Sequence, residues 1–282
     1  MSAADPNGAP AAEIVRQAAR DGEVDHYFAA LMAPNVIRDD VMTMAAFAAV
    51  IGHVPRAVHE PIMGEVRLQW WRDALLLGVH GEPTGHPIAD AVCAVRARHR
   101  LPDELLDGVI DAVSSALSHR ASPEAATDWT RILARFEGGL FLLTAHVHAG
   151  ASVAGCEELF ERAGVAYGLA RALCGLPPAM ASGWPPQLIA ADSPIGDNPA
   201  RMAAIAEIRQ LHDTAREALA EVRRRQGKIP ASAIAALLPL AMVEPYLGAQ
   251  SKAMMTVPMS PVEIMPLARI WRIWRAHRRR WL

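Results

Sequence analysis

The sequence has few cysteines, no long apolar run and no excess of charge of one sign. Its three cysteines, Cys93, Cys156 and Cys174, lie far apart and show neither metal-ligand spacing nor a disulfide framework, so we expect a reducing compartment. The most apolar stretch, residues 231–243, contains Pro239 and is shorter than the about 20 residues that a membrane-spanning helix needs. This stretch is therefore predicted to be a buried helix.

The charge of the chain is nearly balanced, with a formal net charge of −2 at pH 7. Such a chain has no overall field that would attract nucleic acid, so no nucleic-acid partner is expected. The first 20 residues contain acidic residues and prolines but no apolar segment typical of a secretory signal. We therefore expect a cytoplasmic location, either free or peripheral at the inner face of the membrane.

Segments with the alternating pattern of a β-strand are also missing, whereas signals for helix ends recur. Proline stands at first-turn positions such as Pro61 and Pro102, and glycine follows helical runs at Gly78 and Gly150. The pattern predicts an all-α fold in a single domain, residues 13–282, after a flexible N-terminus, residues 1–12. A loop is expected at residues 177–198, and the predicted helices cover residues 36–59, 61–77, 86–99, 102–118, 123–149, 156–176, 199–226, 230–250 and 261–281.

Two segments of the chain resemble the squalene/phytoene synthase family. The first is MAAFAAVIGHVPRAVHEPIMGEVRLQWWRDAL, residues 44–75, and the second is AGVAYGLARALCGLPPAMASG, residues 163–183. Family enzymes carry an aspartate-rich helix, then a double-tryptophan helix, then a second aspartate-bearing helix. The resemblance implies the isoprenoid-synthase type of fold, an all-α helical bundle around a central cavity.

The positions with which the family holds magnesium differ in this chain. In family enzymes, aspartates on two facing helices bind Mg²⁺, and the metal binds the diphosphate of the substrate. None of the matching positions here carries a carboxylate, so the resemblance implies no metal, no cofactor and no assigned catalytic residue. The family aspartates match Gly52, His53 and Arg56 in the first motif, and Gly175 and Ala179 in the second. The usual Gln and Asn of the second motif match Gly168 and Arg171.

The segment MGEVRLQWWRDA, residues 63–74, resembles a non-catalytic branch of the family, which includes a mitochondrial complex I assembly factor and bacterial relatives. The leading hypothesis is therefore a non-catalytic protein, either a respiratory complex I assembly factor or a binder of lipid or of a hydrophobic membrane-protein client. The first alternative is a prenyl-diphosphate transferase of the squalene/phytoene synthase type with displaced metal ligands, which would need Mg²⁺. The second alternative is a metal-free terpenoid or lipid binder.

Five side chains are candidates for binding a ligand. The resemblance implies that His53 and Arg56 point into the cavity, where Arg56 would meet an anionic group without a metal; the alternative is an exposed polar pair at the rim. Arg67 and Arg72 share one predicted helix and are candidates for an anionic ligand or partner, or else for ordinary surface pairs. Arg171 lies in the second segment, at the position that matches the family's usual Asn.

The predicted helix at residues 261–281 is basic and amphipathic. Its tryptophans recur at near-heptad spacing, and six arginines supply a basic face. Helices of this kind suit an anionic membrane surface. The alternative is that the tryptophans pack on the domain and the arginines are solvated. The residues assigned to a membrane or partner contact are Arg269, Trp271, Arg272, Trp274, Arg275, Arg278, Arg279 and Trp281.

Overall fold

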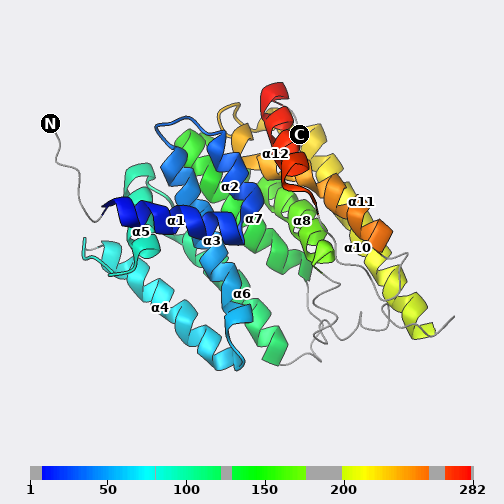
Figure 1. Cartoon of the computed structure of the whole chain (residues 1–282), viewed down its shortest axis with the longest axis horizontal. Coiled ribbons are helices and arrows are strands. Elements are labelled where there is room, and N and C mark those ends of the chain that lie inside the picture. The colour runs from blue at the N-terminus through cyan, green and yellow to red at the C-terminus, as the bar shows by residue number, and fades with distance from the viewer. Residues whose placement is uncertain (1–7, 80, 122–128, 176–198, 254–263, 281–282) are drawn as a thin grey trace.

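The computed structural model describes residues 8–79, 81–121, 129–175, 199–253 and 264–280. Every regular element in these ranges is a helix (Figure 1), which confirms the all-α prediction. The α-helices are α1 (Gly8–Gly22), α2 (Val24–Leu31), α3 (Arg38–Ala57), α4 (Pro61–Val79), α5 (Pro87–His99), α6 (Asp103–Ala121), α7 (Trp129–Ala149), α8 (Glu157–Cys174), α10 (Pro199–Arg225), α11 (Val243–Ala253) and α12 (Pro266–Arg279). Short 3₁₀ helices are η1 (Gly150–Val153), η3 (Gln226–Lys228) and η4 (Ile234–Met242).

The observed helix ends lie close to the predicted ones for α3 to α6, α8 and α10. At the N-terminus, α1 begins at Gly8, before the domain start predicted at residue 13. Near the C-terminus, α12 begins at Pro266, where a proline at the first helical position loses no helical hydrogen bond. The predicted loop at 177–198 and the predicted helix starts at 123 and 261 lie outside the described residues.

The single α-helix predicted at residues 230–250 is wrong. The chain instead forms the 3₁₀ helix η4, with Pro239 inside it, and then the α-helix α11. Proline lacks the backbone N–H, and its ring clashes with the carbonyl four residues earlier, so an α-helix is strongly disfavoured across this position. The apolar stretch is buried as predicted, since Leu237, Leu238 and Leu240 are all in the core. Among the described residues, no helix combines the length and the apolarity needed to cross a membrane.

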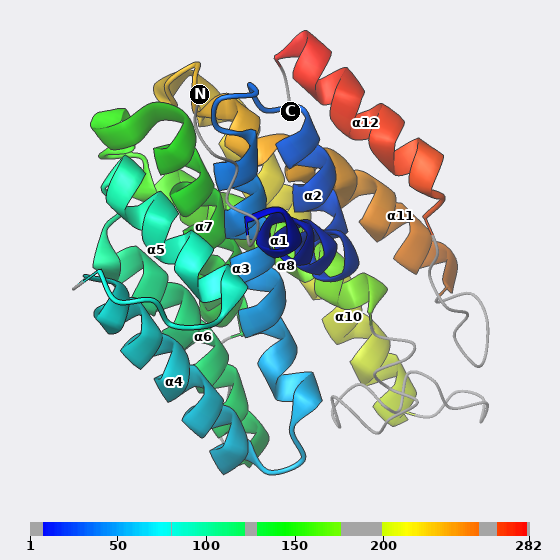
Figure 2. The same ribbon diagram turned by 60° about the vertical axis from the view of Figure 1, so that its left-hand side comes forward.

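Helix α7 joins two hydrophobic cores. Its residues Leu140 and Leu143 pack into a core shared with α1, α3, α4, α5 and α6. Its residues Phe141 and Leu142 lie in a second core with α8, α10, η4, α11 and α12. Figures 1 and 2 show α4 on one side of the molecule and α12 on the other, with α3 and α7 between them.

Candidate functional site

The positions that correspond to the family's metal ligands lie on α3 and α8, and side chains of α7 fill the space beside them. A β-carbon built on Gly52 would lie 2.9 Å from Cζ of Phe136. A β-carbon on Gly168 would lie 2.9 Å from Cβ of Leu133. Such distances are shorter than real β-carbons tolerate, so a larger residue would require the Phe136 ring to turn aside at Gly52 and Leu133 to shift at Gly168. Gly175, which matches a family aspartate, has no such contact with α7. Ala179 lies outside the described residues.

Arg171 places a cation between α8 and the N-terminal helices. Its guanidinium donates to the carboxylate of Glu23, to Oε1 of Glu137 at 3.4 Å and to the backbone carbonyl of Gly22 at 2.9 Å. Glu23 and Glu137 are buried. Two buried carboxyl groups need hydrogen-bond donors, and the guanidinium supplies them through its fork of N–H groups. The predicted ligand-binding role of Arg171 must therefore compete with this ion-pair cluster.

His26 completes a group of three side chains that have the geometry of a metal site. Ligand atoms of Glu23, His26 and Glu137 all lie within 4.8 Å of one another. His26 Nε2 and Glu137 Oε2, 3.9 Å apart, have no hydrogen-bond partner among the described residues. Burial lowers the pKa of His26 to about 3 and raises the pKa of Glu137 to about 8, so both are neutral near pH 7. Because Arg171 already provides a positive charge there, a divalent cation would meet both repulsion and a protonated ligand.

Asp25 forms the centre of a second buried polar cluster. Its carboxylate accepts hydrogen bonds from Tyr167 Oη at 2.9 Å and Tyr246 Oη at 2.6 Å, and it pairs with the guanidinium of Arg269. The cluster ties α2 to α8, α11 and α12. The side chain of Arg269 is only 12% exposed. Assigning Arg269 to the outer basic face of the C-terminal helix is therefore a prediction to correct, because the buried Asp25 holds this arginine on the inner face.

A groove of about 290 Å³ lies between α3, α4 and the segment before α5. Its lining combines the indole rings of Trp70 and Trp71 with the polar side chains of His53, Arg67 and His86. The structure thus brings two predicted ligand-binding residues, His53 and Arg67, to one groove on the surface.

The two remaining candidates, Arg56 and Arg72, lie elsewhere. Arg56 is exposed and is not among the groove residues, although its charge opposes the rise in pKa that burial causes in Glu23. Arg72 bonds Asp107 at 2.9 Å and Asp111 at 2.5 Å, which fastens α4 to α6. The predicted alternative of an ordinary surface pair describes Arg72 well.

Sequence reasoning missed an exposed apolar stripe along α4. Residues 63, 66, 70 and 77 lie three, four and seven residues apart, so they share one face of the helix, and Ile62 lies beside them. The buried face of α4 carries Leu68 and Trp71, while the stripe faces solvent. The helical periodicity of apolar residues along α4 is visible in the sequence. This periodicity alone does not say which apolar face of the helix packs against the bundle. The exposed residues are Ile62, Met63, Val66, Trp70 and Leu77.

The raised pKa of Glu137 predicts a loss of stability at mildly alkaline pH. In the unfolded chain this carboxyl ionises near its ordinary value of 4.5, whereas in the fold its pKa is about 8. Between these values the folded state holds a proton that the unfolded state has lost, so stability falls as pH rises and levels off above about 8. The buried histidines have lowered pKa values, so they make the fold more stable as pH rises toward their ordinary pKa of 6.5. Above that pH they add no further change in stability.

We therefore expect Glu137→Gln to flatten the pH dependence above neutrality. From about pH 6.5 to 8, native stability should drop by about 2 kcal/mol more than that of the variant, which corresponds to one proton over this window. Urea unfolding across the window measures the difference. Glu104→Gln, at an exposed glutamate, is the matched control and should follow the native curve. Parallel curves for the native protein and Glu137→Gln would contradict the prediction.

Comparison with known proteins adds family information to this geometry. The family model for squalene/phytoene synthase matches residues 19–263. Among solved structures, the fold is similar to squalene synthase HpnC from Alicyclobacillus acidocaldarius, with a TM-score of 0.68, 15% sequence identity, and coverage of 90% of this chain and 98% of that chain. The likeness confirms the predicted isoprenoid-synthase type of fold and, at this identity, nothing finer. No curated protein sequence matches the chain.

Proposed function

The chain belongs to the squalene/phytoene synthase family, and from that premise we propose that it is a non-catalytic member that binds a lipid or a hydrophobic client protein. One observation carries the proposal. At Gly52, which matches a family aspartate, and at Gly168, which matches the family's Gln, side chains of Phe136 and Leu133 lie 2.9 Å from where a β-carbon would be. The neighbouring positions carry His53, an arginine at 56 and Arg171 in place of metal ligands.

The chemistry of the family explains why this observation argues against catalysis. Ionisation of a prenyl diphosphate needs Mg²⁺ held by oxygen ligands, so that the metal neutralises the charge of the leaving group. Two buried carboxyl groups near these positions, those of Glu23 and Glu137, are bound by Arg171, and Asp25 is bound by Arg269. A transferase with displaced metal ligands would have to break these pairs, which is why we place that alternative second.

Binding of a hydrophobic partner is supported by the surface of α4. The exposed apolar stripe that begins at Ile62 runs beside the groove lined by Trp70 and Arg67. Contiguous exposed apolar surface on a folded protein marks sites for protein, lipid or membrane contact. A positively charged groove edge beside it suits a ligand with one apolar and one anionic end, such as a lipid, as well as an amphipathic segment of a membrane protein.

The narrower proposal, a role in respiratory complex I assembly, rests on the resemblance of residues 63–74 to the non-catalytic branch. In this segment, polar residues hold α4 in place: Glu65 accepts from Ser114 Oγ at 2.8 Å, and Arg72 binds α6. Leu68 and Trp71 are buried. These contacts fix α4 against α6 and leave the apolar stripe exposed to solvent. An exposed stripe on a fixed helix is consistent with docking of a client.

We expect no Mg²⁺-dependent turnover of farnesyl or geranylgeranyl diphosphate by the purified chain. The reason is the loss of oxygen ligands at the family's metal positions. Release of pyrophosphate is measured with Mg²⁺, with chelator and with heat-inactivated protein, and the three rates should agree. Native mass spectrometry of the same preparation identifies any lipid that copurifies. Metal-dependent pyrophosphate release above both controls would replace the proposal with the transferase alternative.

A further inference from the structure

The outer face of α12 exposes large apolar side chains. Leu267 is 75% exposed, Trp271 is 49% exposed and Trp274 is 46% exposed. The inner face carries Ile273 and Ala276, which are buried in the core shared with α8 and α11. Monomeric soluble proteins seldom expose two neighbouring tryptophans, so this face needs a partner environment that accepts indole rings.

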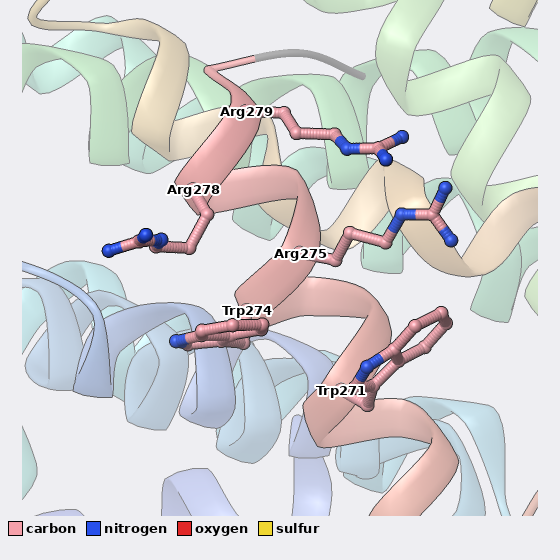
Figure 3. Close-up of a pocket in the computed structure, with 5 residues that line it drawn as sticks. All are labelled: Trp271, Trp274, Arg275, Arg278 and Arg279. Carbon is pink, nitrogen blue, oxygen red and sulfur yellow. The ribbon is translucent and has the colours of Figure 1, made fainter.

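The same helix carries a dense positive charge. Figure 3 shows Arg275 and Arg279 extending on the side of Trp271, and Arg278 on the side of Trp274. The guanidinium of Arg275 lies 5.1 Å from the ring of Trp271, and that of Arg278 lies 5.7 Å from the ring of Trp274. Together with Arg279 these side chains surround a shallow hollow of about 550 Å³.

In the part of the chain that the structure describes, these arginines have no acidic partner, unlike several arginines elsewhere in the fold. Helix α12 contains no acidic residue, and within the described ranges no carboxylate pairs with its outward-facing arginines. By contrast, Arg16, Arg72, Arg162 and Arg225 all form salt bridges with carboxylates. The outer arginines of α12 are Arg272, Arg275, Arg278, Arg279 and Arg280.

We propose that the outer face of α12 docks the protein peripherally onto a membrane surface that carries anionic lipid headgroups. Tryptophan prefers the boundary between headgroups and acyl chains, and arginine pairs there with phosphate. The charge of the face, unbalanced by acidic residues, selects an anionic surface over a neutral one. The proposal does not depend on whether the chain is catalytic.

The fold holds α12 in one orientation for this contact. Arg269 pairs with buried Asp25, so the inner face is fixed to α2 while the tryptophans face outward. Figure 2 shows α4 on the far side of the molecule from α12. A protein attached through α12 therefore leaves the apolar stripe of α4 free for its own partner.

Vesicle co-sedimentation of the full-length chain tests the proposal. The vesicles are phosphatidylcholine alone, and phosphatidylcholine mixed with phosphatidylglycerol. Point variants are preferable to truncation, because removing α12 would also leave Asp25 buried without its cation. The two test variants are Arg275→Ser with Arg278→Ser, and Trp271→Ala with Trp274→Ala. The matched controls are Arg16→Ser with Arg20→Ser, and Ile14→Ala with Met202→Ala, which change exposed residues of α1 and α10.

We expect the native chain to bind the anionic vesicles at low salt and to leave the neutral ones in the supernatant. The double arginine variant should bind about 25-fold more weakly, from about fivefold per basic residue at such a surface. The double tryptophan variant should bind roughly tenfold more weakly through lost apolar burial. Added salt should weaken binding, and the controls should match the native chain. Absence of binding, equal binding to both vesicle types, or unchanged binding of both test variants would overturn the proposal.

Discussion

Replacement of Asp25 by alanine is expected to lower the free energy of unfolding by about 3 to 5 kcal/mol, the range typical when one partner of a buried ion pair is removed. Asp25 is fully buried and binds Arg269, Tyr167 and Tyr246 at once. Without it, the guanidinium stays in the interior without its counter-charge, and two phenol groups lose an acceptor. The loss should be large because four helices meet at this carboxylate.

Urea unfolding followed by circular dichroism measures the effect. Asp73→Ala is the matched control, because Asp73 is an exposed aspartate on α4 that accepts a hydrogen bond from Gln69 on the same helix and, within the described ranges, from no other side chain. This change should alter stability by less than about 0.5 kcal/mol. The double variant Asp25→Asn with Arg269→Met removes both charges and should recover part of the loss. If Asp25→Ala were no more harmful than Asp73→Ala, the cluster would not hold these helices together.

The helices could be predicted from the sequence because their signals are local. Proline at first-turn positions and the recurrence of apolar residues fix where α4, α5 and α10 begin, and both can be read within a few residues. Pro239 can also be read from the sequence, but the helix predicted at residues 230–250 included it in its interior. The 3₁₀ conformation of η4 is consistent with the missing backbone N–H of Pro239. A prediction based on the apolar composition of the segment does not take this missing donor into account.

For the site, the sequence predicts which metal-binding side chains are missing, but not what takes their place in space. The lack of carboxylates at Gly52 and Gly168 is a property of the sequence, whereas their contact with Phe136 and Leu133 depends on how α7 lies between α3 and α8. The pairing of Arg171 with Glu23 joins residues far apart in the chain, so no local pattern indicates it.

The orientation of α12 also could not be predicted from the sequence. Its amphipathic period predicts two faces, but which face turns inward depends on what the rest of the bundle offers. Here the buried carboxylate of Asp25 holds Arg269 inward, and Trp271 is consequently left outside.

Helices α7 and α8 approach each other most closely at two glycines, and Gly164→Ala is expected to lower the free energy of unfolding by about 3 kcal/mol, toward the upper end for overpacking. A β-carbon on Gly164 would lie 2.3 Å from the backbone nitrogen of Gly138 and 2.7 Å from its α-carbon. Backbone atoms have no alternative rotamer, so the two helices would have to separate. A shift of α7 would disturb the packing of both hydrophobic cores, because α7 contributes residues to each of them.

Gly108→Ala on α6 is the control of opposite sign. No atom lies within 4 Å of a β-carbon built on Gly108, so alanine fits there without strain. Alanine in the middle of a helix is favoured over glycine by about 0.5 to 1 kcal/mol, and this variant should therefore be more stable than the native chain. Thermal and urea unfolding of the two variants should move in opposite directions from the native protein. A stabilising effect of Gly164→Ala would mean that α7 and α8 lie further apart than their glycines indicate, and that Leu133 does not close the space beside Gly168.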